Sequence, residues 1–168
     1  MKHRLSFAMI TLLVPCLLIG CKLPRDYTEF MKLTEERQKE EFEKLALEKQ
    51  VDFYLLRSLN SHPSDSSLGE IIAKKGEEAI PYLIERLRTE DKDYNKQFLI
   101  KIFVQMHTNI VDLRKRQDVI EVIEDSIKQI KSSHEKDLSQ LSLNYIKATI
   151  PRYAEDFTNP LPASPPVF

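Results

Sequence analysis

The sequence predicts an all-α protein, and three observations support that prediction. The chain has 168 residues and only three glycines, so it offers few positions for the tight primed turns that connect β-hairpins. Strong helix formers such as Glu, Lys and Leu dominate the composition. Apolar residues recur three and four positions apart in most segments, which is the period of an amphipathic helix.

The first twenty residues have the organisation of a secretory signal peptide. Lys2 and Arg4 form a basic start, and an uncharged apolar run follows over residues 5–19. This run is shorter than the ~20 residues that a membrane-spanning helix needs. We therefore expect residues 1–20 to be removed from the mature protein.

The end of this segment, Leu18-Ile19-Gly20-Cys21, resembles the lipobox of bacterial lipoprotein signal peptides. The resemblance implies cleavage between Gly20 and Cys21 and acylation of Cys21 with palmitate-type chains. It also implies a protein anchored to the membrane by lipid and exposed outside the cytoplasm. The alternative is an ordinary secretory signal that happens to contain a cysteine.

Two neighbouring positions bear on this resemblance. Cys16 is the only other cysteine, but Pro15 directly before it does not fit a lipobox. Lys22, rather than Asp, follows Cys21, so the family's sorting rule implies the outer membrane, on its periplasmic face, if the cell has two membranes.

The charge of the mature chain argues against a nucleic-acid-binding protein. Of the 25 basic side chains, Lys2 and Arg4 are lost with the signal, which leaves 23 against 26 acidic ones and a net charge of −3. A nucleic-acid-binding surface is strongly basic. Because Cys21 is the only cysteine left, no disulfide framework is expected, and the helical core must supply the stability.

The mature chain is expected to begin with one long helix, from residue 26 to about residue 59. Asp26 and Glu29 have the spacing of a capping box at its start. Residues 34–41 contain no apolar side chain, and opposite charges recur four positions apart there. We therefore expect residues 21–46 to form a lipid anchor followed by a charged, solvated helical neck.

A helical body is expected over residues 47–155. Ser67 and Glu70 give a second capping signal, and Gly76 is placed to end the short helix that they begin. An amphipathic helix follows over residues 77–88.

The helix expected over residues 93–107 is apolar on nearly every side. Such a helix is buried by several neighbours, so it should lie at the centre of the core. Phe98 and Ile102 on this helix are both expected to be buried.

Residues 68–107 resemble one helical pair of a HEAT-type repeat, with Pro81 near the start of the first helix. The resemblance implies stacked α-helical layers that serve as a binding surface, without a catalytic mechanism. A free-standing stack of this kind usually needs about three repeats. We expect only one further pair, so the long first helix should cap the stack.

The second pair consists of two amphipathic helices. The first has apolar positions from Val119 to Ile130 at helical spacing. The second begins at the capping box of Ser132 and Glu135 and ends before Pro151. Its inner side is expected to carry four residues: Leu138, Leu141, Tyr145 and Ile146. Residues 156–168 are rich in proline, so a disordered tail is expected there.

No catalytic, metal-binding or cofactor-binding constellation is expected. His62, His107 and His134 occur without metal-ligand spacing, and the chain lacks a glycine-rich phosphate loop. His107 and His134 lie at predicted helix ends, where a capping or solvated histidine is commoner than a ligand.

Two other charged groups each have two interpretations. Glu121, Glu124 and Asp125 form either a carboxylate cluster or, more commonly at this spacing, the solvated face of a helix. Residues 114–116, all basic, contact lipid headgroups or form a polar connection between helices.

Three functional hypotheses remain open. The first is a lipid-anchored α-helical protein of the bacterial cell envelope that binds another envelope protein, with no cofactor and no nucleic acid. The second is an envelope enzyme, such as a hydrolase, whose site is assembled from residues scattered in the sequence. The third is a purely structural surface lipoprotein.

Overall fold

The structure is a computed structural model that describes residues 25–60 and 67–150. These residues form α-helices and short 3-10 turns, with no strand among them, which confirms the all-α fold class. They fall into two compact units that divide after Gln38. The proline-rich tail expected at residues 156–168 lies outside the described residues.

The expectation of one long first helix is wrong, because the chain breaks it twice. The structure has α1 (Arg25–Phe30), α2 (Glu35–Glu43) and α3 (Leu47–Asn60) in its place. The boundary between the two compact units falls inside α2.

A glutamine side chain lies at each break and bonds to the carbonyl groups that a helix end leaves unpaired. Gln38 Nε2 donates to Leu33 O at 2.9 Å and to Met31 O at 3.4 Å, just after α1. Gln50 Nε2 donates to Phe42 O, at the end of α2, at 2.7 Å. The sequence pattern treated both glutamines as ordinary polar residues of a continuous helix.

The charged stretch 34–41 is solvated, as expected, except at Gln38. Its Glu and Arg side chains are exposed, and Glu41 forms an ion pair with Lys44 at 2.7 Å. Gln38 is buried, however, and Phe42 directly after the stretch is completely buried. This segment therefore contributes buried side chains as well as charge.

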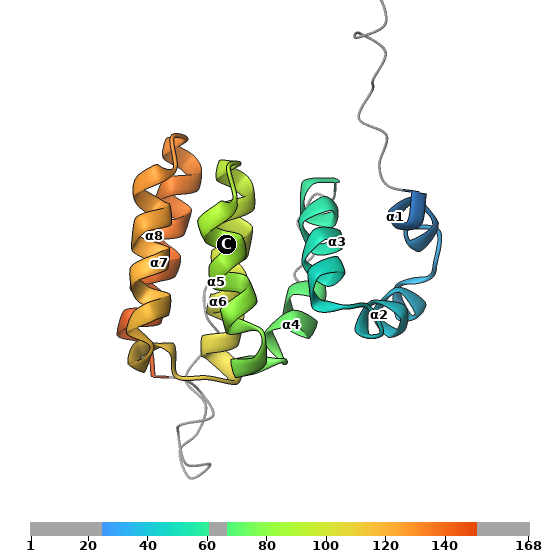
Figure 1. Ribbon diagram of the computed structural model, residues 1–168, viewed down its shortest axis with the longest axis horizontal. Coiled ribbons are helices and arrows are strands. Elements are labelled where there is room, and N and C mark those ends of the chain that lie inside the picture. Colours follow the sequence, from blue (N-terminus) through green and yellow to red (C-terminus); the bar gives the residue numbers. More distant parts are fainter. Residues whose placement is uncertain (1–24, 61–66, 151–168) are drawn as a thin grey trace, which may run out of the picture. The chain divides into compact units, whose positions relative to one another are not determined.

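The second unit stacks three helical pairs rather than the expected two (Figure 1). The additional pair consists of α3 and the short α4 (Ser67–Ala73). Its first helix, α3, corresponds to the last part of the single long helix that the sequence predicted over residues 26–59. The other pairs are α5 (Ile80–Thr89) with α6 (Asp93–Asn109), and α7 (Gln117–Gln129) with α8 (Ser133–Ala148).

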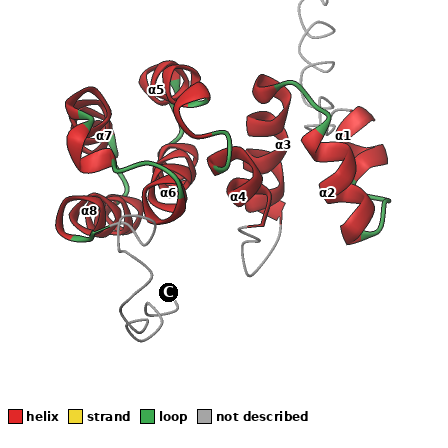
Figure 2. Ribbon diagram, turned by 90° about the horizontal axis from the view of Figure 1, so that it is seen from below, coloured by secondary structure: helices red, strands yellow, loops and turns green. Residues whose placement is uncertain are grey.

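The helices of this unit lie in two rows (Figure 2). Helices α4, α6 and α8 form one row, in which α6 packs extensively on both neighbours, and α5 packs on α7 in the other. The 3-10 turn η2 (Gly76–Glu78) precedes α5, and η3 (Leu113–Lys115) precedes α7. Gly76 has a φ of 58°, as expected for the residue that ends a helix in the left-handed conformation.

Helix α6 is the centre of the core, as expected. Ile102 and Phe103 are completely buried. Phe98 is only half-buried, which corrects the expectation for that residue. Its ring meets the edge of Tyr54 from α3 at 6.3 Å between centroids, so it packs on one side and reaches solvent on the other.

The buried faces of the last pair are partly as expected. The apolar stripe of α7 is buried throughout, including Ile123 and Ile127. On α8 the expectation is wrong for Leu141, which is 53% exposed, and confirmed for Ile146, which is buried. Leu138 and Tyr145 are half-buried, and the other buried residues of this helix, Ser139 and Leu143, were not expected. The buried face of α8 lies beside the expected one, which shows that the most apolar line along a helix need not face its neighbours.

The start of α8 is held by a carboxylate from another helix. Asp93 Oδ2 accepts hydrogen bonds from Lys131 N at 2.9 Å and from Ser132 N at 2.8 Å. In a capping box, the carboxylate of Glu135 would accept a hydrogen bond from Ser132 N. Here Asp93 accepts that bond instead, and Glu135 accepts a hydrogen bond from Ser132 Oγ.

Candidate functional site

Several residues named in the sequence analysis lie outside the described part of the chain. These are the cleavage position Gly20, the lipidated residue Cys21 and His62. Within residues 25–60 and 67–150, no helix is long and apolar enough to cross a membrane.

His107, on the last turn of α6, is a buried polar residue of the second unit. The sequence suggested a capping or solvated histidine, but the residue is completely buried. Its Nδ1 accepts a hydrogen bond from Leu113 N at 3.3 Å, and its Nε2 lies 3.0 Å from Thr149 O. The ring therefore joins α6 to η3 and to the end of α8.

These contacts determine the tautomer of His107. A backbone N–H can only donate and a carbonyl oxygen can only accept. Nδ1 must therefore be unprotonated, and Nε2 must carry the hydrogen that Thr149 O accepts. Burial lowers the pKa of His107, because it disfavours the charged imidazolium. Hydrogen bonding to the backbone of Thr149 and of Val111 and the charge of Asp112 raise this pKa in opposition, while the charge of Arg114 lowers it further.

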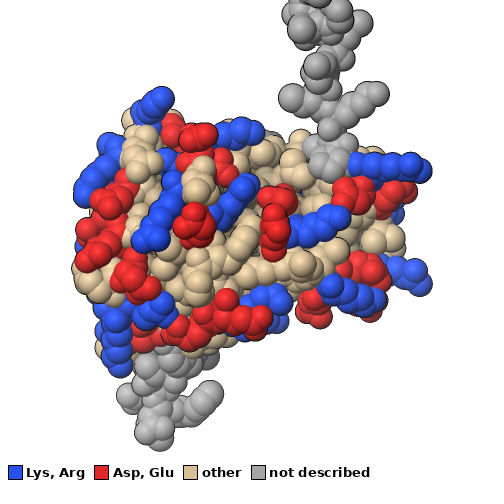
Figure 3. Space-filling model, viewed as in Figure 1, with Lys and Arg blue, Asp and Glu red and all other residues tan. Residues whose placement is uncertain are grey.

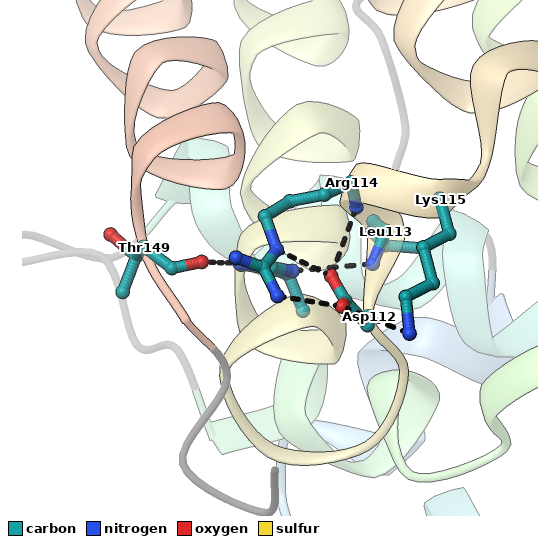
Figure 4. A network of polar contacts seen from close by, with 6 residues as sticks. Asp112, Leu113, Arg114, Lys115 and Thr149 are labelled. Atoms are coloured by element: carbon teal, nitrogen blue, oxygen red, sulfur yellow. Dashed lines mark hydrogen bonds and ion pairs between the residues drawn. The ribbon is translucent and has the colours of Figure 1, made fainter. Parts of the chain in front are cut away.

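A second set of contacts lies next to His107, around Asp112 (Figure 4). Arg114 Nε and Nη2 each donate to the Asp112 carboxylate at 2.8 Å, and Arg114 N donates to the same group at 3.2 Å. The side-chain hydrogen bonds from Arg114 lower the pKa of Asp112 to about 2. Asp112 is thus ionised and shapes the connection between α6 and α7.

This geometry favours the connecting role for residues 114–116. Arg114 is held by Asp112, and Arg116 is paired with Asp118 and Glu77. Lys115 is 82% exposed and lies 3.8 Å from Asp112. All three cations are therefore engaged in ion pairs within the protein, although Lys115 makes only a long one.

The carboxylates of α7 are engaged separately. Glu121 accepts from Gln117 at 3.0 Å, Asp125 pairs with Lys128 at 2.8 Å, and Glu124 pairs with Lys147. Among the described residues, no group of three His, Cys, Asp or Glu side chains is placed to hold a metal ion. The geometry favours the solvated face over a carboxylate cluster.

A charged cluster between α3 and α5 was not found in the sequence. Arg86 Nη2 lies 3.4 Å from both Asp52 and Glu90, and Tyr82 lies close by. Burial raises the pKa of Asp52, opposed by Arg86 and reinforced by Glu48 and Glu90. Arg86 and Glu90 are four residues apart on the sequence, but only the packing brings Asp52 to them.

Two shallow hollows meet at Lys74, near the end of α4. The larger measures about 190 Å³ and is lined by five residues: Glu43, Gln50, Ile71, Lys74 and Lys75. The smaller measures about 90 Å³ and is lined by six: Glu70, Ala73, Lys74, Gln105, Asn109 and Ile110. Both combine apolar and polar side chains.

The larger hollow contains an unusual polar group. Gln50 is completely buried, and while its Nε2 bonds to Phe42, its Oε1 has no hydrogen-bond partner among the described residues. A buried acceptor of this kind is stabilised by a water molecule or by a donor on a ligand.

The face of the molecule seen in Figure 3 has mixed charge. On the face shown in Figure 3, acidic and basic side chains alternate without a large region of one sign.

No protein-family model matches the sequence, and comparisons with curated proteins and with solved structures found no significant match.

Proposed function

We propose that the protein is a bacterial lipoprotein, anchored to the cell envelope through Cys21, whose helical body binds another envelope protein. The sequence Leu18-Ile19-Gly20-Cys21 carries the proposal of anchoring, because it combines the features of a lipobox. With Lys22 after the cysteine, the proposed location is the periplasmic face of the outer membrane in a cell with two membranes.

The proposal of binding rests on the stacked helices. Residues 68–107, which include α5 and most of α6, resemble one helical pair of a HEAT-type repeat, a family in which stacked helices form binding surfaces. The hollows at Lys74 lie along the row that contains α4 and α6, with polar groups beside the apolar side chains of Ile71 and Ile110. Lys74 and Lys75 have no ion pair with a described residue, so their charges are available to a partner.

The anchoring is tested with the two cysteines as a matched pair. Cys21→Ser should accumulate as an unprocessed precursor and incorporate no labelled palmitate in bacteria. Cys16→Ser should be processed and labelled like the wild type. Two or three acyl chains, at about 0.8 kcal/mol per buried methylene, suffice for a stable anchor. A labelled and cleaved Cys21→Ser variant would show that the protein is not a lipoprotein of this type.

The binding is tested by placing a photo-crosslinking amino acid at one of two exposed lysines in the lipidated full chain. Position 74 borders both hollows, and Lys136 is exposed on α8, away from the residues that line them. Irradiation of intact cells should give an adduct of defined mass from position 74 and none from position 136. No adduct, or the same adducts from both positions, would favour the purely structural lipoprotein.

An envelope hydrolase is the second candidate, favoured by the cluster of Asp52, Tyr82 and Arg86. Carboxyl groups with a raised pKa are frequent in enzyme active sites. If the cluster is catalytic, Asp52→Asn should abolish a hydrolytic activity found for the full chain, while Asp125→Asn on the solvated face of α7 should retain it. Equal activity of both variants would exclude the cluster as the catalytic site.

A further inference from the structure

His107 is placed to respond to acid. It is buried, and both of its ring nitrogens are engaged by backbone groups of other segments, Leu113 N and Thr149 O. The two contacts differ in the role of the ring, because Nε2 donates to Thr149 while Nδ1 accepts from Leu113. Protonation of Nδ1 would therefore affect only one of them.

We propose that His107 is a pH-sensitive latch, which holds the connection at residues 110–116 on α6 at neutral pH and releases it when the ring is protonated. A proton on Nδ1 would face the N–H of Leu113, so that N–H would lose its acceptor, while the backbone of Val111 favours the protonated ring. The contact to Thr149 persists, because Nε2 donates in both protonation states. Acid thus loosens the connection while the end of α8 stays attached.

The charged and titratable groups around the ring set when this happens. Two charged residues of the connection itself affect the pKa of His107: Asp112 raises it and Arg114 lowers it. Asp112 is also hydrogen-bonded to Arg114. From α8, Tyr145 packs its ring edge-to-face with that of His107, with centroids 6.2 Å apart. Lys147 of α8 is paired with Glu124 of α7.

The direction of the effect follows from burial. The pKa of His107 is lower in the folded protein than in the unfolded chain, where it is 6.5, so the folded protein binds the proton less readily. The stabilising contribution of His107 is therefore fully present above that value and is lost as the pH falls through the lower, folded-state pKa.

Release of the connection at residues 110–116 would also change the smaller hollow. Ile110, at the start of the connection, lines that hollow and is 37% exposed. Its Cγ2 also lies 3.0 Å from the position that a side chain on Gly76 would occupy. Acid should therefore change the shape of the hollow as well as the hydrogen bonds of Leu113. The latch does not depend on what the hollow binds.

The latch is tested by NMR on the ¹⁵N-labelled full chain in detergent, from about pH 7.5 to 4.5, the range in which histidines titrate. The ring signals of His107 report its protonation, and hydrogen exchange of the Leu113 amide, corrected for the intrinsic rate, reports the latch. Protection of Leu113 should fall about five- to tenfold with the midpoint of His107, as expected for one lost hydrogen bond. The Ile123 amide in α7 should keep its protection.

Two variants complete the experiment. In His107→Gln the amide retains one donor and one acceptor but cannot titrate, so the step at Leu113 should disappear. His134→Gln, which replaces an exposed histidine on α8, should leave it unchanged.

The proposal would be overturned by any of three results. They are constant protection of Leu113 while His107 titrates, a step that persists in His107→Gln, and protonation of His107 only after the whole domain has unfolded. The first and third need only the wild-type chain, so they remain decisive if a variant fails to fold.

Discussion

Gly76 shows at the scale of one residue how a backbone conformation restricts the sequence. Its φ of 58° is unfavourable for residues with a side chain, and among these asparagine tolerates it best. A Cβ at this position would also lie 3.0 Å from Ile110. The residue therefore has both a conformational and a steric reason to be glycine.

Replacement of Gly76 separates these two reasons. Gly76→Ala should lower the free energy of unfolding by about 1–2 kcal/mol. Gly76→Asn adds the same Cβ but tolerates the left-handed region, so it should cost less if conformation dominates. Denaturant unfolding of both variants measures the difference. An equal loss in the two would assign the effect to the contact with Ile110.

Ile102 and Phe98 give a second prediction at this scale, because they share a helix and differ in burial. Ile102 is completely buried, so Ile102→Ala should cost about 2–5 kcal/mol. Phe98 is half-buried, so Phe98→Ala should cost less than the ~3–5 kcal/mol of a fully buried phenylalanine. Urea unfolding of the two variants tests the orientation of α6, which would be wrong if Phe98→Ala were the more damaging.

At the scale of elements, helix ends in this protein are satisfied by side chains from other segments. Gln38 and Gln50 bind carbonyl groups near the ends of α1 and α2, and Asp93 binds the N–H groups at the start of α8. Each contact fixes where a helix begins or ends. The breaks in the first part of the chain follow from these contacts, since that segment contains no glycine and no internal proline after Pro24.

The carboxylate of Asp93 should make the attachment of α8 dependent on pH. Hydrogen bonds from Ser132 N and Lys131 N lower the pKa of Asp93 below its unfolded value of 3.8. The stabilisation is therefore present above 3.8 and is lost as the pH falls through the folded-state pKa.

Asp93→Asn should thus lower the melting temperature at neutral pH, and the difference from the wild type should shrink in acid. Asp91→Asn, two residues earlier and exposed, is the control and should melt like the wild type. Thermal unfolding followed by circular dichroism measures both. A deficit for Asp93→Asn that stays constant down to the acid limit would show that its charge is not involved.

At the scale of the whole molecule, the second unit is a stack that ends in a largely polar layer. The outward side of α7 and α8 carries charged and amide side chains, with Leu141 as the large apolar exception. A polar outer face is what the terminal layer of such a stack requires to stay soluble. The layer is therefore suited to close the stack at this side.

Two leucines on α8 test this arrangement. Leu143 is buried on α8, which packs on α6 and α7, so Leu143→Ala should cost about 2–5 kcal/mol. Leu141 is exposed, so Leu141→Gln should change the stability by no more than about 0.5 kcal/mol. Chemical denaturation distinguishes the two. A large loss for Leu141→Gln would mean that this face is covered, for example by a second molecule.

Much of the candidate chemistry depended on contacts between distant residues. His107 meets Thr149 and Asp52 meets Arg86 only after the helices pack, so the sequence alone showed each as an isolated polar residue. Cys21, in contrast, is a local motif that needs no tertiary contact to be recognised. Its lipidation stays a prediction, because it lies outside the described residues.

The sequence by itself determined the fold class, the central position of α6, the buried face of α7 and the left-handed residue Gly76. These properties depend on composition, on a period of 3.6 residues or on the conformational freedom of one residue, all of which are local. Only the tertiary structure decided the breaks on either side of α2, the third helical pair, the buried face of α8 and the role of His107. The physical reason is that each depends on which polar groups and faces find partners across the fold. His107 and Thr149, for example, are 42 residues apart in the chain.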